Sequence, residues 1–250
     1  MSTPQHSTTK SLKNAILDAL FPILCLSCEK EGFWLCDSCA AQTKILDFQV
    51  CPICEDMLTE KGYLCSACRA SQKSNLDSLI TAVSYEDPTT RKLVYNFKYR
   101  FVGDISLLLA KFICKALIRN DFPLPDIISP VPLHPRRLRW RGFNQSLLLA
   151  EYIAEELTPL MKIKVLDILE RKKYSQPQMQ VKNYQQRLQN VQHIFGLKSD
   201  TNHDLIKNKR ILLIDDIATT GATLKECAKV LKQFGAKKVF AAVVARQTVK

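Results

Sequence analysis

Beyond about residue 76, short apolar stretches alternate with longer stretches whose apolar residues recur every three or four positions. The short stretches are typical of buried strands, and the helical period is typical of helices with one face toward a core. The predicted strands are residues 76–86, 125–133, 162–171, 209–214 and 237–246. The predicted helices are residues 104–118, 144–157 and 223–234. This alternation predicts an α/β fold with a mainly parallel sheet and helices on its faces.

Local signals mark some of the element ends. Asn144 is the expected N-cap of helix 144–157, and Gly235 is expected to close helix 223–234. Residues 172–195 are polar, rich in glutamine and without a clear period. They predict an irregular insertion with one helix around residues 183–191.

Cysteine usage changes abruptly along the chain. Eight of the ten cysteines lie between Cys25 and Cys68, in a region that looks duplicated, and the polar stretch 69–77 is typical of a linker. We therefore predict a polar tail over residues 1–20, a small cysteine-rich domain over 21–70 and the α/β domain over 76–250. Cys114 and Cys227 stand alone in the second part and are predicted to fill the core.

The clustered cysteines form four Cys-x-x-Cys pairs. Each pair presents two thiolates from one tight turn, and two pairs complete a tetrahedral four-sulfur site for zinc. Pairing in sequence order gives one tetrad of Cys25, Cys28, Cys36 and Cys39, and another of Cys51, Cys54, Cys65 and Cys68. An interleaved pairing stays open, and disulfides would be disfavoured in a reducing compartment. Four sulfur ligands leave no position for water, so both zinc ions are predicted to be structural.

Two adjacent carboxylates, Asp215 and Asp216, follow the apolar strand before residue 215 and precede a small-residue loop and a helix. Ligands of open α/β sheets bind at such strand ends, where a helix N-terminus offers free N–H groups to an anion. The residues expected to hold a phosphate are Thr219, Thr220, Gly221, Ala222 and Thr223. The carboxylates would repel that phosphate but accept hydrogen bonds from sugar hydroxyls, so the pattern favours a ribose 5-phosphate. The alternative is that the carboxylates cap the turn or bind Mg²⁺ and the threonines cap the helix.

A basic loop follows the predicted strand 125–133. It contains His134 and four arginines, Arg136, Arg137, Arg139 and Arg141. The guanidinium groups of the arginines suit phosphate oxygens. The first interpretation is a contact with pyrophosphate. A competing role is binding of single-stranded DNA, in which Trp140 and Phe143 stack on the bases while the arginines follow the backbone. The third alternative is a solvated basic surface with Trp140 as a packing anchor. Residues 98–100 form a second, less specific basic candidate.

Net charge and hydropathy narrow the partners. The formal net charge of +12 favours polyanions such as nucleic acid, phosphate-rich metabolites or an anionic membrane surface. An apolar run of about 18 residues, which a transmembrane helix requires, does not occur. The N-terminal residues also lack the features of a secretory signal, so we expect a cytoplasmic protein without a transmembrane segment.

The stretch "ILLIDDIATTGATLKECAKVL" resembles the phosphoribosyl pyrophosphate signature of type I phosphoribosyltransferases. Together with the cysteine pairs, "VPLHPRRLRWRGFNQSLLLA" and "SQPQMQ", it resembles the ComF family of competence-associated proteins over about residues 20–247. The resemblance implies a double zinc ribbon joined to a type I phosphoribosyltransferase-like fold and a role in natural transformation. It implies that Asp215 and Asp216 hold ribose hydroxyls, that residues 219–223 surround the 5-phosphate, and that His134, Arg139 and Arg141 lie near the pyrophosphate.

Three functions compete at this point. The preferred one is a DNA-handling accessory protein that binds phosphoribosyl pyrophosphate with Mg²⁺, alongside single-stranded DNA and competence-pathway proteins such as helicases. The second is an active phosphoribosyltransferase, which needs pyrophosphate as leaving group and an acceptor that no motif identifies. The third is a zinc-ribbon protein that binds single-stranded nucleic acid without catalysis.

Overall fold

A computed structural model describes residues 22–71, 74–100, 103–158, 162–172 and 194–247. The chain divides into two compact units, Met1–Thr43 and Lys44–Lys250. The predicted helix around residues 183–191 lies outside the described residues. Among the described residues, no helix is long and apolar enough to cross a membrane.

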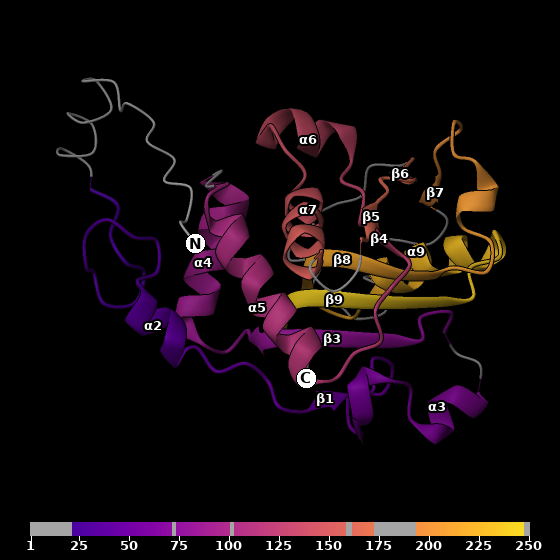
Figure 1. The fold of residues 1–250 in the computed structure, drawn as a ribbon, viewed down its shortest axis with the longest axis horizontal. Helices are drawn as coiled ribbons and strands as arrows, with labels where there is room; N and C mark the ends of the chain where they lie inside the picture. The colour runs from indigo at the N-terminus through magenta and orange to yellow at the C-terminus, as the bar shows by residue number, and fades with distance from the viewer. Residues whose placement is uncertain (1–21, 72–73, 101–102, 159–161, 173–193, 248–250) are drawn as a thin grey trace. The chain divides into compact units, whose positions relative to one another are not determined.

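The first unit contains two short turns and a short helix, α2 (Asp37–Gln42), drawn in indigo in Figure 1. Leu24 and Glu31 form an antiparallel bridge, which closes the turn that carries Cys25 and Cys28. The N–H of Leu26 donates to the carbonyl of Trp34 at 3.0 Å and joins this turn to the segment before α2.

The second unit is built on a five-stranded parallel sheet. Its strands, in spatial order, are β3 (Ser78–Ser84), β9 (Lys238–Arg246), β8 (Arg210–Ala218), β4 (Ile127–Pro130) and β5 (Lys164–Val165). Every neighbouring pair in this order runs parallel. The mainly parallel sheet predicted from the sequence is confirmed.

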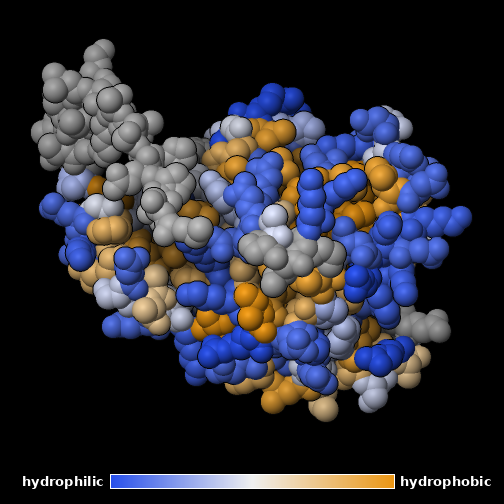
Figure 2. Space-filling model, in the orientation of Figure 1, coloured by the Kyte–Doolittle hydropathy of each residue, from blue (hydrophilic) through white to orange (hydrophobic). Residues whose placement is uncertain are grey.

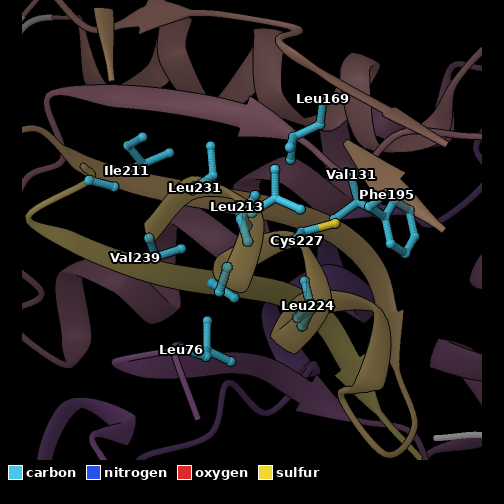
Figure 3. Packing of buried hydrophobic residues seen from close by; sticks show 14 of the residues in the cluster. Leu76, Val131, Leu169, Phe195, Ile211, Leu213, Leu224, Cys227, Leu231 and Val239 are labelled. Carbon is cyan, nitrogen blue, oxygen red and sulfur yellow. The ribbon is translucent and has the colours of Figure 1, made fainter. Parts of the chain in front are cut away.

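Helices cover both faces of this sheet: α5 (Ile105–Arg119) and α7 (Gln145–Leu157) contact one face, and α9 (Ala222–Gln233) contacts the other. Helix α4 (Pro88–Tyr99) contacts α5, and α6 (Pro135–Arg141) follows β4 and has no buried residue. Figure 3 shows Leu213 of β8 and Val239 of β9 in one cluster with Leu224 and Leu231 of α9. Alternate residues of the same strands point to the opposite face and are also buried, while α5 and α7 contact the sheet (Figure 1). Burial on both faces explains the near-continuous apolar strands.

Two predicted features differ in the structure. The single strand predicted over 162–171 is two short strands, β5 and β6 (Leu169–Arg171), and β6 pairs antiparallel with β7 (Phe195–Leu197) in a separate sheet. Residues 88–99 form helix α4, which was not predicted, with Asp87 as its N-cap. The buried apolar residues of α4, Leu93, Val94 and Phe97, have helical spacing but span little more than one turn, which is too short a pattern for a helix prediction.

The second cysteine segment packs against the edge strand β3. It contains β1 (Gln49–Val50), β2 (Leu58–Thr59), the 3-10 turn η1 (Glu60–Gly62) and α3 (Ser66–Ala70). The Gln49 side chain accepts a hydrogen bond from the N–H of Thr81 at 2.8 Å and donates to the Thr81 carbonyl at 3.1 Å. Gly62 lies so close to Leu79 that an added Cβ would stand 2.1 Å from the Leu79 carbonyl oxygen.

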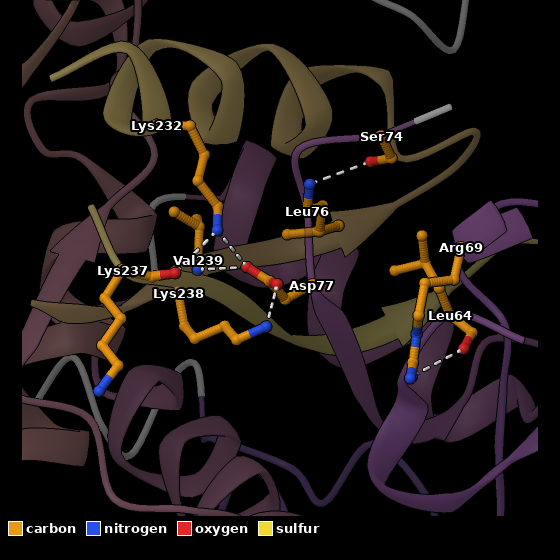
Figure 4. A network of polar contacts seen from close by, with 9 residues as sticks. All are labelled: Leu64, Arg69, Ser74, Leu76, Asp77, Lys232, Lys237, Lys238 and Val239. Atoms are coloured by element: carbon orange, nitrogen blue, oxygen red, sulfur yellow. Dashed lines mark hydrogen bonds and ion pairs between the residues drawn. The ribbon is translucent and has the colours of Figure 1, made fainter. Parts of the chain in front are cut away.

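The chain then enters β3 through an anchored turn (Figure 4). Asp77 accepts a hydrogen bond from the N–H of Val239 at 2.8 Å and pairs with Lys232 and Lys238 at 2.8 and 2.9 Å. These contacts fix the start of β3 against β9 and α9. On the face drawn in Figure 2, hydrophilic residues cover much of the surface, with apolar patches between them.

Candidate ligand-binding cleft and metal centres

A cleft of about 390 Å³ lies at the carboxyl ends of β4 and β8. Its walls come from the end of α4, the segment after β4, helix α6, the start of α7 and the segment that follows β8. Parallel sheets place their ligand sites at this edge because the strand ends and helix N-termini meet there. The cleft therefore lies where the sequence predicts a ligand.

Asp215 is held at the base of the cleft by two donors. Its Oδ1 accepts hydrogen bonds from the Ser146 hydroxyl at 3.0 Å and from the N–H of Asp216 at 2.9 Å. Burial, with the nearby charge of Asp216, raises the pKa of Asp215 to about 7, although Lys98 opposes the shift. The carboxyl group can thus gain or lose a proton near neutral pH.

Asp216 has a different environment. Its Oδ1 pairs with Lys98 at 2.8 Å and accepts from the N–H of Ile217 at 2.6 Å, and the residue is only 5% exposed. Lys98 comes from the second basic candidate, residues 98–100, so α4 supplies the counter-charge for the acidic pair. The hydrogen bonds and the ion pair described for Asp215 and Asp216 all involve Oδ1.

The loop after β8 is short because the strand continues past the carboxylates to Ala218. The strand was predicted to end before Asp215, so this boundary is corrected. Thr219 and Thr223 line the cleft. Thr220 is fully buried, and its hydroxyl accepts a hydrogen bond from the N–H of Ala222 at 3.3 Å. Gly221 adopts φ +66° at the start of α9, a conformation that glycine reaches without strain.

The predicted basic loop is a helix, α6, and this corrects the sequence interpretation. Pro135 at the first helical position and the His134 side chain, whose Nδ1 accepts from the N–H of Arg136 at 3.1 Å, start the helix. Burial and the surrounding arginines lower the pKa of His134, so the neutral ring is favoured for this cap.

The helix divides the predicted basic residues. Arg137, Trp140 and Arg141 line the cleft, whereas Arg136 and Arg139 are exposed outside the cleft lining. Arg141 donates to Oε1 of the buried Gln145 at 2.9 Å, and its pKa is lowered by burial against the attraction of Asp216. The cleft thus has a basic wall opposite its acidic base.

Aromatic rings extend from this basic wall. Tyr95 and Tyr99 lie 5.2 Å apart, Tyr99 and Trp140 lie 6.5 Å apart, and the Arg141 guanidinium stands 5.5 Å from the Tyr99 ring centre. Trp140 is 60% exposed and Tyr95 is 56% exposed. Phe143 instead lies 6.0 Å from the fully buried Phe97 and outside the cleft lining. Its position suits packing better than stacking on a base.

Several residues of the cleft were not found from the sequence. Ser146, Gln145 and Arg171 all line it. Ser146 and Gln145 begin helix α7, and only their position beside the expected N-cap Asn144 could have pointed to them. The Asn144 side chain does accept from the N–H of Ser146 at 3.1 Å, which confirms that N-cap. Arg171 comes from β6, whose separate pairing the sequence did not reveal.

The eight clustered cysteines form two tetrads in sequence order. The Sγ atoms of Cys25, Cys28, Cys36 and Cys39 lie within 4.8 Å of one another, as do those of Cys51, Cys54, Cys65 and Cys68. The Cys28–Cys36 and Cys54–Cys65 sulfurs are 3.6 and 3.9 Å apart. A tetrahedral zinc site with Zn–S bonds of about 2.3 Å requires sulfurs about 3.8 Å apart, so both tetrads fit zinc.

Backbone donors support the thiolates in both tetrads. The N–H of Cys36 donates to Sγ of Cys25, and the N–H of Cys65 donates to Sγ of Cys51, each at 3.4 Å. Although burial opposes the shift, backbone donors lower the pKa of Cys25 to about 6 and of Cys51 to about 7: first the N–H groups of Cys28 and Cys54, then those of Cys36 and Cys65. Thiolates are the form that binds zinc. Cys114 and Cys227 are buried apart from both tetrads, and the core role predicted for them is confirmed.

Part of the second unit matches a known family of domains. Residues 144–250, which include the acidic pair, the loop and α7, match the phosphoribosyl transferase domain family. The parallel sheet with helices on both faces and the ligand cleft at its carboxyl edge agree with that class.

Full-length relatives identify the family more closely. The chain is 31% identical over 210 residues to competence protein ComFC of Streptococcus pneumoniae, covering 82% of this chain and 84% of that protein. It is 29% identical over 230 residues to competence protein F of Haemophilus influenzae, covering 88% of this chain and 95% of that protein. It is also 26% identical to DNA utilization protein YhgH of Escherichia coli, over 87% and 94% of the two chains. The chain belongs to the ComF family.

Proposed function

We propose that this protein binds phosphoribosyl pyrophosphate in the cleft and handles DNA during natural transformation. The names of its relatives, competence protein F and DNA utilization protein YhgH, support the setting. The net charge of +12 supports polyanionic partners.

One observation carries the ligand assignment: a single cleft is lined by Asp215 and Asp216, by Thr219 and Thr223, and by Arg137 and Arg141. Carboxylates suit ribose hydroxyls, hydroxyls beside a helix N-terminus suit a phosphate monoester, and arginines suit a pyrophosphate. Phosphoribosyl pyrophosphate presents all three groups on one molecule. Magnesium would accompany the pyrophosphate and be held mainly by its oxygens, because Mg²⁺ usually takes few protein ligands at phosphate sites.

Calorimetric titration of the protein with phosphoribosyl pyrophosphate and Mg²⁺ tests this assignment. In Asp215→Asn the side-chain oxygen can still accept from Ser146 and Asp216, so the fold is kept while the charge is lost. We expect the affinity for phosphoribosyl pyrophosphate to fall about tenfold or more, because a charge-assisted hydrogen bond is lost. Asp167→Asn, which changes an exposed carboxylate paired with Lys198, is the matched control. Absence of binding by the wild type, or equal binding by Asp215→Asn, would refute the assignment.

The proton on Asp215 gives this titration a second readout. Since the pKa of Asp215 is raised to about 7, the affinity of the wild type should increase from about pH 6 to about pH 8 as the carboxyl ionises. The affinity of Asp215→Asn should change less over the same range. A parallel pH dependence in both proteins would assign the effect to another group.

The aromatic rings beside the cleft favour single-stranded DNA as the second partner. Tyr95, Tyr99 and Trp140 form a row of rings next to Arg141, and two of the three are more than half exposed. Bases stack on such rings while cations contact the phosphates, and each stacked base contributes about 1–3 kcal/mol. Trp140→Ala should weaken binding of an oligothymidylate in fluorescence anisotropy, whereas Ile118→Ala, which removes an exposed apolar side chain of α5, should not.

Catalysis is a separate question with a separate experiment. In the proposed binding mode, the carboxylates and threonines of the cleft bind the ribose phosphate and the arginines bind the pyrophosphate. The Tyr99–Trp140 pair could hold the base of an acceptor. Release of pyrophosphate on adding nucleobases or nucleotides to the loaded protein would support an active phosphoribosyltransferase. Binding of DNA without any binding of phosphoribosyl pyrophosphate would instead support a zinc-ribbon nucleic-acid-binding protein.

A further inference from the structure

Arg246 at the carboxyl end of β9 links the second cysteine tetrad to the loop after β8. The residue is 8% exposed, and its guanidinium donates to Oε1 of Glu55 at 2.7 Å and to the carbonyl of Pro52 at 3.2 Å. A longer contact of 3.5 Å reaches the carbonyl of Thr219. Pro52 lies between Cys51 and Cys54, and Glu55 follows Cys54, so one buried cation contacts both the metal-binding turn and the loop.

The backbone of Arg246 is fixed beside the same loop. In the parallel ladder Arg246 pairs with Ala218, and the N–H of Gln247 donates to the Ala218 carbonyl at 2.8 Å. The Arg246 side chain therefore begins next to the last residue of β8, directly before the loop, and has a defined distance to span. This position depends on the sheet and not on the cysteines.

A second cation makes a related connection. Lys225, one turn into α9, donates from Nζ to the carbonyl of Thr220 at 3.0 Å. Burial and the charge of Arg246 lower the pKa of Lys225, while Glu55 acts in the opposite direction.

The two carbonyl contacts constrain the loop amides. In a trans peptide the N–H points opposite to the carbonyl of the same peptide plane. Holding the Thr219 and Thr220 carbonyls on the side of Arg246 and Lys225 therefore directs the N–H groups of Thr220 and Gly221 away from that side. Backbone N–H groups of this kind are the donors that an anion at a helix N-terminus uses.

The cysteine segment is attached firmly enough to transmit such a constraint. Gln49 hydrogen-bonds both backbone groups of Thr81, Tyr63 bridges to Ser78, and Ser78 donates from its hydroxyl to the carbonyl of Lys61. These contacts join the segment to the edge of the sheet on one side, while Pro52 and Glu55 face Arg246 on the other.

We propose that the second cysteine tetrad controls the conformation of the loop after β8. Metal held by Cys51, Cys54, Cys65 and Cys68 keeps Pro52 and Glu55 in position to accept hydrogen bonds from Arg246. Loss of that metal frees Arg246 from its partners, loosens residues 218–222 and weakens anion binding in the cleft. Arg246 acts as a positioning residue and does not itself line the cleft. The ligand part of this inference rests on the proposed function, whereas the coupling between tetrad and loop does not.

Substitution of Arg246 tests the coupling. We expect Arg246→Gln to accelerate hydrogen exchange of the amides of residues 219–222 and to weaken phosphoribosyl pyrophosphate binding about tenfold, in line with loss of charge-assisted hydrogen bonds. Arg246→Lys should recover part of both effects, because lysine restores the charge but not the planar fork. Arg210→Gln is the matched control, since it breaks an arginine–carboxylate pair with Asp126 at the opposite end of the sheet. Loop exchange that is equal in wild type and Arg246→Gln would overturn the proposal.

Removal of the metal tests directly whether the second tetrad controls the loop after β8. In a Cys25→Ser, Cys28→Ser protein, zinc remains only at the second tetrad, so a chelator followed by zinc replacement reports on that site alone. Exchange of the loop amides should increase on zinc removal and return on zinc addition, with ligand affinity following the same cycle. Unchanged exchange would reject the control role. Changed exchange in a wild type that binds no phosphoribosyl pyrophosphate would reject the proposed ligand and leave the coupling standing.

Discussion

The two cysteine tetrads have matching local geometry and different surroundings. In each, the residue after the second cysteine is a glutamate with positive φ, Glu29 at 64° and Glu55 at 63°. Its N–H donates to the carbonyl of the first cysteine, at 2.9 Å from Glu29 and 3.0 Å from Glu55. A short helix starts after the third cysteine in both, α2 after Cys36 and α3 after Cys65. The metal sites are therefore repeats of one design.

The two tetrads differ in the part of the structure to which they belong. The first tetrad lies in a compact unit that ends at Thr43, whereas the second belongs to the same unit as the parallel sheet. The sequence predicts one cysteine-rich domain over residues 21–70, and that boundary stays a prediction. We therefore expect the two tetrads to have different roles: zinc at the first would stabilise its own unit, and zinc at the second would also stabilise the edge of the sheet.

The largest expected difference follows from loss of one cysteine ligand. Cys51→Ser should lower the free energy of unfolding of the main unit by at least about 4 kcal/mol, because binding of structural zinc contributes directly to folding. Cys25→Ser should leave that main transition nearly unchanged and affect only the first unit. Chemical denaturation followed by circular dichroism measures the transition, and zinc content should fall by one ion in each variant.

Zinc content is also the control for this pair. Each variant should retain the ion of the other tetrad, which shows that the remaining site is folded. Equal loss of stability in the two variants would mean that the first tetrad supports the sheet as much as the second does.

Two glycines in the cysteine segments offer the next comparison. Gly32 and Gly62 both have positive φ, at 91° and 65°, but a Cβ on Gly62 would stand 2.1 Å from the Leu79 carbonyl oxygen. At Gly32 a Cβ would meet no atom of the described residues within 4 Å. Gly62→Ala should therefore cost about 3 kcal/mol, from left-handed strain and overpacking, and Gly32→Ala about 1 kcal/mol from strain alone. Thermal unfolding of both variants gives the difference, and similar costs would show that Gly62 is not a tight docking point.

Most of the fold could be predicted from the sequence because buried strands and helices carry strong periodic patterns. Helix α7 has Leu149, Ile153 and Leu157 on one buried face and a capping asparagine before it. Helix α4 was not predicted because its buried apolar residues, Leu93, Val94 and Phe97, span little more than one turn. The attachment of the second tetrad to β3 could not be predicted either, since it depends on side-chain contacts such as Gln49 with Thr81, about 30 positions apart in the chain.

The part of the candidate site whose residues are contiguous in the sequence could be predicted. Asp215, Asp216 and the threonine loop occupy consecutive positions, so residue chemistry alone suggested a sugar phosphate. Lys98 and Ser146, which contact those carboxylates, come from two other helices and gave no joint signal. The link through Arg246 to Glu55 spans 191 positions and becomes visible only when the sheet brings them together.

A smaller effect on stability is expected at Asp77. This residue follows the second tetrad in the chain and directly precedes β3. The pKa of Asp77 is lowered because hydrogen bonds from Lys232, Val239 and Lys238 outweigh the effect of burial. A lowered pKa means that the charged carboxylate stabilises the fold above its ordinary pKa of about 3.9, and that this contribution disappears as the pH falls through the folded-state value. Asp77→Asn should cost about 2 kcal/mol at neutral pH and nearly nothing in acid. Asp37→Asn in the first unit is the control, and an equal pH dependence of unfolding in both variants would contradict the role given to Asp77.

The smallest expected effect compares the two glutamates that follow the first Cys-x-x-Cys pair of each tetrad. Glu55 is mostly buried and accepts from Arg246 at 2.7 Å, whereas Glu29 is exposed. Glu55→Gln keeps a side-chain acceptor for Arg246 but removes the charge, so it should cost about 1 kcal/mol. Glu29→Gln should leave stability unchanged within error. Because both positions have the same backbone conformation, the substitution cancels local effects of the turn. What remains is the contact with the sheet, and equal stability of the two variants in urea titration would show that the Glu55–Arg246 pair does not stabilise the attachment.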